Sequence, residues 1–197
     1  MIEILIADDH AIVREGLKQI VAEEKDMAVT GEAGDCNELF SILKSKTFSI
    51  IVLDINMPGK SGLEALKELK AFYSDIPVLI LSMYDEEHYG LRALKGGASG
   101  YLKKGSATSE LVKAIRIIIN GGKYISHPLA EKLADLINTK KTKNQPANLS
   151  DREYEILCKI ASGKSAEEIA KELNISIHTV YTYRTRIMEK MNLKKPK

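Results

Sequence analysis

Five short apolar runs, separated by helix-length segments, limit what this chain can fold into more than any other feature. The runs cover residues 2–7, 28–33, 50–53, 78–81 and 99–102. The segments between them carry apolar residues at the spacing of amphipathic helices. Strands that are apolar on both faces and alternate with helices indicate a parallel sheet covered on each side. We therefore predict an α/β fold with a doubly wound, five-stranded parallel sheet for residues 1–122.

Polar side chains follow four of the five runs, at the points where the strands end. Asp8 and Asp9 follow the first run, Asp54 the third, Ser82 the fourth and Lys104 the fifth. In a sheet of the flavodoxin-like strand order, the carboxyl ends of the strands meet at one edge, where ligands bind. Each of these residues alone could be an ordinary helix cap or turn residue. Five of them at one predicted edge favour a functional cluster.

The composition of this cluster points to phosphoryl chemistry. Three ionised carboxylates placed close together raise one another's pKa unless a cation joins them. Mg²⁺ suits such a site, because it prefers oxygen ligands and leaves coordination positions open for a phosphate. A lysine and a serine hydroxyl would contact the phosphate oxygens. The pattern favours phosphoryl transfer to a carboxylate, with Asp54 as the nucleophile.

Charge and cysteine content narrow the class of protein. Residues 1–130 hold 15 Lys and Arg against 18 Asp and Glu, whereas residues 131–197 hold 14 against 9. A basic C-terminal part suggests contact with a polyanion, although basic segments are often only solvated. Cys36 and Cys158 lie far apart, which argues against a disulfide framework or a zinc site. Because the chain has no long apolar run and no signal-like start, we expect a cytoplasmic protein with no membrane contact.

After residue 122 the pattern changes to that of a linker and a small helical domain. Residues 123–148 contain a short predicted helix and a polar, basic stretch, which favours a linker. Ser150 and Ser165 each precede a glutamate by three positions, the capping box that opens a helix. A third helix is predicted from residue 176 to about residue 191. Its inward face would hold Ile177, Val180, Tyr183, Ile187 and Met191.

The outward face of this third helix is polar and basic. Its candidate contact residues are His178, Tyr181, Thr182, Thr185, Arg184 and Arg186. Residues 176–197 hold six Lys and Arg and one acidic residue, enough to engage backbone phosphates. A short helix, a tight turn and a longer basic helix predict a helix-turn-helix, whose second helix lies in the major groove of double-stranded DNA. Residues 149–197 are therefore predicted to be a small all-α DNA-binding domain.

Four motifs at the predicted sheet edge carry a family resemblance. They are the acidic pair at residues 8 and 9 and the stretches LDINMPGKSG, LILSMY and GYLKK. With these motifs in this order, residues 1–120 resemble a two-component receiver domain. The resemblance implies that Asp54 accepts a phosphoryl group from a sensor histidine kinase, with Ser82 and Lys104 as catalytic partners. Lys104 fits the family's spacing better than Lys103.

The same resemblance implies a metal site and a switch. Asp8 or Asp9, Asp54 and the backbone carbonyl of Asn56 would hold Mg²⁺. Ser82 would move toward the new phosphoryl group and Tyr101 would turn inward, which shifts the population between two existing states. The alternative interpretation of Tyr101 is an ordinary strand-edge aromatic, and of the two we favour the switch.

The C-terminal segment resembles the LuxR-type DNA-binding domain in LSDREYEIL, ASGKSAEEIAKELNIS and TVYTYRTRIMEKM. Together, the two parts resemble the NarL/FixJ family of response regulators. The family pattern implies base contacts from Tyr181, Thr182 and Thr185, and phosphate contacts from Thr179, Arg184 and Arg186. It also implies a homodimer. Because the family continues with a fourth helix, we expect a C-terminally incomplete domain that binds DNA more weakly than an extended one.

The predicted function is that of a phosphorylation-controlled transcription factor, which is not an enzyme. Two alternative functions stay open. A Mg²⁺-dependent phosphatase would pass through a phosphoaspartate, but such enzymes usually carry a second acid two residues after the nucleophile, where this chain has Asn56. An interaction module would use phosphorylation to control protein contacts without binding DNA. Turnover of small phosphoesters and salt-dependent binding to duplex DNA would separate these functions.

Overall fold

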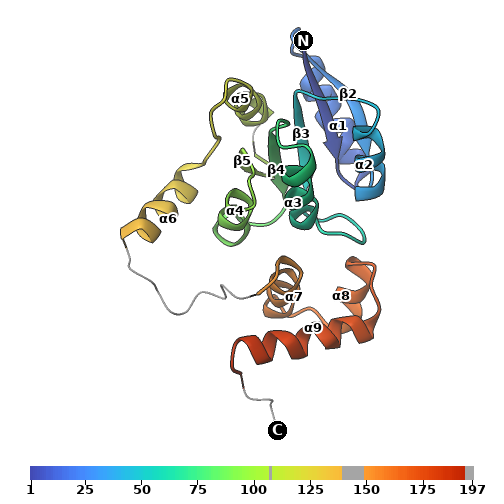
Figure 1. Ribbon diagram of the computed structural model, residues 1–197, viewed down its shortest axis with the longest axis vertical. Helices are drawn as coiled ribbons and strands as arrows, with labels where there is room; N and C mark the ends of the chain where they lie inside the picture. Colours follow the sequence, from blue (N-terminus) through green and yellow to red (C-terminus); the bar gives the residue numbers. More distant parts are fainter. Residues whose placement is uncertain (107, 139–148, 194–197) are drawn as a thin grey trace. The chain divides into compact units, whose positions relative to one another are not determined.

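The computed structural model describes residues 1–106, 108–138 and 149–193. The chain divides into two compact units, Met1–Thr139 and Lys140–Lys197 (Figure 1). The predicted linker residues 139–148 lie outside the described residues. The predicted division at residues 122 and 148 stays a prediction. None of the helices in the described part of the chain combines the length and the hydropathy that crossing a bilayer requires.

The first unit is built on a five-stranded parallel sheet. Its strands are β1 (Ile2–Ala7), β2 (Met27–Ala33), β3 (Ile50–Asp54), β4 (Val78–Ser82) and β5 (Gly100–Lys103). Their order across the sheet is β2-β1-β3-β4-β5, and every neighbouring pair is parallel. This is the flavodoxin-like order, with its topological switch point between β1 and β3. The predicted fold class is confirmed.

Helices cover both faces of the sheet. They are α1 (Ala11–Ala22), α2 (Cys36–Leu43), α3 (Gly62–Phe72), α4 (Glu86–Lys95) and α5 (Thr108–Ile119). Helices α1 and α5 pack against one face, in a core that includes Leu17, Ile115 and the strand residue Val52. The neighbouring strand residues Ile51 and Leu53 point to the other face and are fully buried. Burial on both faces explains why the strands read as continuous apolar runs.

Local sequence fixes where α3 begins, and with it the loop after β3. Ser61 and Glu64 form a capping box, in which each side chain accepts a hydrogen bond from the other residue's backbone N–H. Gly62 follows directly, and a Cβ at this position would lie 2.1 Å from the backbone oxygen of Asp54. Only glycine therefore lets the first turn of α3 approach the end of β3 so closely.

A sixth helix, α6 (His127–Asn138), belongs to the first unit and packs on α4. Leu129 is almost fully buried, and its methyl groups occupy the space above Gly90 of α4, where a Cβ would lie 2.8 Å from Leu129 Cδ2. The Ser126 hydroxyl, just before α6, hydrogen-bonds the carboxylate of Glu86. The segment after the sheet is thus attached to the helix that follows β4.

Residues 149–193 of the second unit form three helices around a small apolar core. They are α7 (Asp151–Ala161), α8 (Ala166–Glu172) and α9 (Ile177–Lys190). Both predicted capping boxes form, at Ser150 with Glu153 and at Ser165 with Glu168. Asn174 takes a positive φ of 50° in the short turn between α8 and α9, a conformation that asparagine tolerates better than most residues.

The inward face of α9 is shorter than the sequence pattern predicted. Val180 and Ile187 are buried in the core of this unit, and Tyr183 packs partly against it. Ile177 and Met191 were predicted to face inward but are 42% and 37% exposed. Ile177 is the first residue of α9 and Met191 is its C-cap, so both lie at the ends of the helix. Periodicity identifies the face of a helix but not the length of its neighbours.

Candidate active site and nucleic-acid interface

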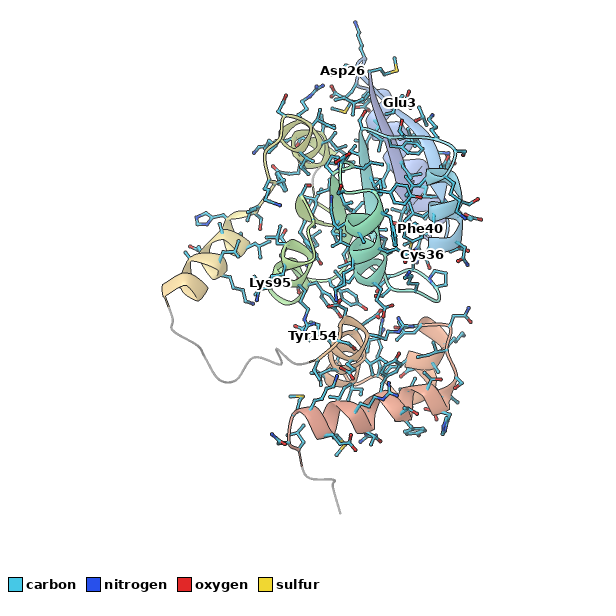
Figure 2. All side chains as sticks on the ribbon, viewed as in Figure 1. Glu3, Asp26, Cys36, Phe40, Lys95 and Tyr154 are labelled. Atoms are coloured by element: carbon cyan, nitrogen blue, oxygen red, sulfur yellow. The ribbon has the colours of Figure 1, made fainter. Side chains whose placement is uncertain are left out.

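The structure brings the predicted residues of the first unit together at the carboxyl edge of the sheet. In Figure 2, the labelled Glu3 and Asp26 mark the opposite, amino edge. Asp54 and Ser82 are the last residues of β3 and β4, and Asp8 follows β1. All three are buried, with 2%, 0% and 1% of their surface exposed. The carboxylate and hydroxyl groups are therefore held by strand ends rather than by mobile loops.

Lys104 joins the two buried carboxylates. Its Nζ lies 2.7 Å from Asp54 Oδ2 and 2.6 Å from Asp8 Oδ2, and its side chain is only 8% exposed. Burial raises the pKa of Asp54 to about 6, and the charge of Asp8 adds to this effect while Lys104 opposes it. Burial alone would lower the pKa of Lys104, but the two carboxylates outweigh it and raise that pKa. Lys103 instead pairs with Asp85 at the surface.

The oxygen atoms at this edge suit a hard divalent cation. Ligand atoms of Asp8, Asp9, His10 and Asp54 all lie within 4.8 Å of one another. Asp54 Oδ1 and Asn56 Oδ1 are buried without a hydrogen-bond partner among the described residues. A buried carboxylate oxygen without a partner is costly, and a cation would satisfy it. Sequence reasoning missed His10, although its position directly after two acidic residues was a signal.

Ser82 and Tyr101, the two residues that were predicted to form a switch, both hydrogen-bond the backbone of Tyr84. Ser82 Oγ accepts a hydrogen bond from the backbone N–H of Tyr84 at 3.2 Å. Tyr101 is fully buried, and its hydroxyl donates to the backbone oxygen of Tyr84 at 2.9 Å. Burial raises the pKa of the Tyr101 hydroxyl, so it stays a donor. Tyr101 thus points inward in this structure.

The loop between these groups is coupled to α4. The ring of Tyr84 stacks on the ring of Tyr89, with 4.4 Å between their centroids. Tyr89 belongs to α4 and is 1% exposed. Tyr84 therefore contacts Ser82, Tyr101 and Tyr89 of α4.

The outward face of α9 carries all seven predicted DNA-contact residues. His178, Tyr181, Arg184, Thr185 and Arg186 are exposed, whereas Thr179 and Thr182 are half-buried. The threonine hydroxyls are oriented by the helix, because Thr182 donates to the backbone oxygen of His178 and Thr185 to that of Tyr181. Each hydroxyl keeps acceptor capacity toward solvent.

Contacts within the second unit hold α9 in place. Ser176 caps its start, accepting a hydrogen bond from the backbone N–H of Thr179 at 3.0 Å. Lys190, near its end, pairs with Glu153 of the α7 capping box at 2.7 Å. Although burial raises the pKa of Glu153, the contacts with Lys190 and Ser150 lower it below its ordinary value. The cap thus defines the start of α9, and the Lys190–Glu153 pair attaches its C-terminal end to α7.

Family models match both units. Residues 4–116 match the response regulator receiver domain, and residues 147–196 match the bacterial regulatory proteins of the luxR family. The chain belongs to the NarL/FixJ family of response regulators. Its relatives include response regulator UvrY of Escherichia coli K12, which is 34% identical over 98% of this chain and 89% of that protein. Oxygen regulatory protein NreC of Staphylococcus epidermidis strain RP62A is 37% identical over 98% of this chain and 92% of that protein.

Solved structures of response regulators agree with this assignment. RcsB of Salmonella enterica, bound to promoter DNA in the presence of a beryllofluoride phosphomimetic, is 26% identical, with a TM-score of 0.68 over 99% of this chain and 94% of that chain. A LuxR-family response regulator from Aurantimonas is 33% identical, with a TM-score of 0.65 over 71% of this chain and 99% of that chain. This response regulator is accordingly a DNA-binding transcription regulator with a receiver domain. Its family is one of regulators rather than of enzymes.

Proposed function

We propose that Asp54 is the phosphoryl acceptor of this response regulator and that a sensor histidine kinase is the donor. The observation that carries this proposal is the buried Asp54 carboxylate, paired with Lys104 through Oδ2 while Oδ1 has no hydrogen-bond partner among the described residues. A desolvated carboxylate with one oxygen available is placed to attack, and Lys104 is placed to contact the incoming phosphoryl oxygens.

Mg²⁺ is the proposed cofactor. Asp8, Asp9, Asp54 and the backbone carbonyl of Asn56 would hold it, since they offer the oxygen ligands that this ion prefers. The ion would supply positive charge to the phosphoryl oxygens of the donor. In the structure, the ammonium group of Lys104 lies 2.6 Å from Asp8 Oδ2 and 2.7 Å from Asp54 Oδ2.

The chemical step forms an acyl phosphate. One oxygen of the Asp54 carboxylate attacks the phosphorus of the donor phosphohistidine, an O–P bond forms, and the N–P bond breaks. The nitrogen lone pair returns to the imidazole, which takes a proton from solvent. Lys104 gives a charge-assisted hydrogen bond to the new phosphoryl group, and Ser82 gives one from its hydroxyl. Asp54 supplies the nucleophile, and the other residues contribute by positioning the groups and stabilising charge.

The response passes from Ser82 to DNA binding. Movement of Ser82 toward the phosphoryl group pulls on Tyr84 and stabilises the inward Tyr101, so the population shifts to one state of α4 and β5. Two regulator molecules then bind related half-sites as a homodimer. Base contacts come from Tyr181, Thr182 and Thr185, and phosphate contacts from Thr179, Arg184 and Arg186. His178 lies on the same DNA-facing side of α9. Since the target is bacterial DNA, the proposed location is the cytoplasm.

A phosphorylation assay tests this proposal. The protein is incubated with Mg²⁺ and acetyl phosphate, and its intact mass is measured for the wild type, Asp54→Asn and the matched surface control Asp75→Asn. We expect one added phosphoryl group in the wild type and the control and none in Asp54→Asn. An adduct in all three would refute Asp54 as the acceptor. No adduct in any of them, followed by failure to bind beryllofluoride, would refute phosphorylation at this site altogether.

A binding assay tests the second half. A fluorescent duplex of random sequence is titrated with unphosphorylated and phosphorylated protein over a series of salt concentrations. We expect salt-dependent binding that strengthens on phosphorylation. Hydrolysis of p-nitrophenyl phosphate, with no duplex binding, would favour the phosphatase hypothesis instead.

A further inference from the structure

An imidazole lies at the mouth of the acidic cluster. The Nδ1 atom of His10 is 2.6 Å from Asp9 Oδ1 and 3.3 Å from Asp8 Oδ1. The His10 side chain is 58% exposed, whereas that of Asp8 is 2% exposed. Buried carboxylates therefore form the floor of the cluster, and His10 and Asp9 form its rim on the solvent side.

The position of the His10 ring is set by the backbone. His10 is the N-cap of α1, with extended φ and ψ of −89° and 104°. Its backbone N–H donates to Asp8 Oδ1 at 2.9 Å, so the residue is attached to the same carboxylate that its ring faces. Arg14, one turn into α1, donates to the backbone oxygen of Asp8 at 2.7 Å and also binds Glu32. These contacts within the protein are enough to hold the imidazole next to the carboxylates.

Imidazole nitrogen and carboxylate oxygen together select a different ion from carboxylate oxygen alone. Mg²⁺ demands oxygen ligands and keeps several waters, whereas imidazole suits ions later in the first transition series. Mn²⁺ accepts both ligand types and resembles Mg²⁺ in its preference for carboxylates. A second, independent observation points to a cation here, because Asp54 Oδ1 is buried and without a hydrogen-bond partner among the described residues.

We propose that His10 is a ligand of the cation site, and that its Nδ1 gives this site a preference for Mn²⁺ over Mg²⁺. The proposal rests on the cation site described under the proposed function. His10 binds only ions that accept nitrogen, so it strengthens Mn²⁺ binding while Mg²⁺ is held by the oxygen atoms of Asp8, Asp9, Asp54 and Asn56. The imidazole thus decides which ion loads the regulator when both are present.

Pulsed electron paramagnetic resonance of bound Mn²⁺ tests this directly, because coupling to a ligand nitrogen is visible in the signal. The full chain without a histidine tag is loaded with Mn²⁺ as wild type, His10→Ala and the remote control His127→Ala, whose side chain is 83% exposed. We expect nitrogen coupling in the wild type and in His127→Ala, and its loss in His10→Ala. Free Mn²⁺ is counted in the same samples to give affinity, with Mg²⁺ as competitor.

The affinities separate ligation from a merely structural role. Loss of a ligand is expected to weaken Mn²⁺ binding by about tenfold, with Mg²⁺ binding changed less than about twofold. Bound Mn²⁺ without nitrogen coupling in the wild type would overturn the proposal, as would an equal loss of Mn²⁺ and Mg²⁺ affinity in His10→Ala. If Asp54 is nevertheless phosphorylated, the proposed function stands and only the role of His10 fails. If neither ion binds and Asp54 stays unmodified, both fail.

Discussion

The two functional surfaces of this regulator place their charged groups in opposite environments. At the sheet edge, Asp8 and Asp54 are almost fully buried and Lys104 is 8% exposed. On α9, Arg184 and Arg186 are exposed, and Tyr181 is 48% exposed. The first surface handles a small anion and the second a long polyanion, and the difference in burial follows from this.

Burial of charged side chains has a different consequence for function at each surface. Chemistry on one phosphoryl group needs fixed charges in a low dielectric, where each interaction is strong and each unpaired charge is costly. Binding to DNA replaces counterions along a backbone, so side chains that are already solvated do it at little cost to the fold. Substitutions at the sheet edge should therefore change stability and function together, whereas substitutions on α9 should change binding alone.

The largest effect is expected for Lys104→Met. Without the ammonium group, Asp8 and Asp54 face each other as buried carboxylates with no cation between them. Removing one partner of such a group costs about 3 kcal/mol, which corresponds to about 10 °C in the melting temperature of a domain of this size. Calorimetry of the full chain in EDTA checks this, and Mg²⁺ should restore more stability to the variant than to the wild type.

Lys103→Met is the matched control for this comparison. It removes the neighbouring charge, which pairs with Asp85 at the surface, and surface pairs contribute about 0–1 kcal/mol. If both substitutions lowered the melting temperature equally, the sheet edge would be as well hydrated as the surface, and the contrast between the two surfaces would fail.

A smaller effect of opposite sign is expected for Asp54→Asn. The folded-state pKa of Asp54, about 6, lies above the ordinary value of 3.8 for an aspartate side chain. Protonation of this group therefore favours the folded state, a contribution that is fully present below about pH 3.8 and is lost as the pH rises through 6. At pH 7.5 the wild type carries an ionised, desolvated carboxylate that the amide avoids. The variant should be more stable by about 1–3 kcal/mol, since one pKa unit equals 1.36 kcal/mol.

Thermal melts in EDTA between pH 4 and pH 8 measure this difference. The advantage of Asp54→Asn should shrink as the pH falls from 6 to 4. Mg²⁺ at pH 7.5 should also reduce it, because the wild type gains binding free energy. An advantage that is independent of pH would mean that the carboxyl group is not the source of the difference.

Much of this structure could be predicted from the sequence, because the elements that carry both surfaces show a periodic pattern of apolar residues. The strands start and end within a residue or two of the predicted runs, since burial on both faces makes each run apolar. Asp54, Ser82 and Lys104 could be placed at one edge of the sheet because parallel strands bring their carboxyl ends together. Contacts between residues far apart in the sequence leave no such pattern. Lys190 and Glu153, for example, pair across two helices although they are 37 positions apart. The closeness of Gly62 to Asp54 likewise follows from backbone geometry alone.

The smallest effect on stability is expected for Arg184→Ala, which removes one exposed charge from α9. Stability should change by less than about 0.5 kcal/mol, because nothing buried is lost. Affinity for duplex DNA should fall by a similar factor for every sequence, and the slope of log affinity against log salt should decrease by about 1. Fluorescence anisotropy at several salt concentrations measures both. Lys113→Ala on α5 removes the same charge from the first unit and should leave the slope unchanged. A sequence-dependent loss would instead make Arg184 a base contact, and the exposed face of α9 would then carry more specificity than its threonines and tyrosine supply.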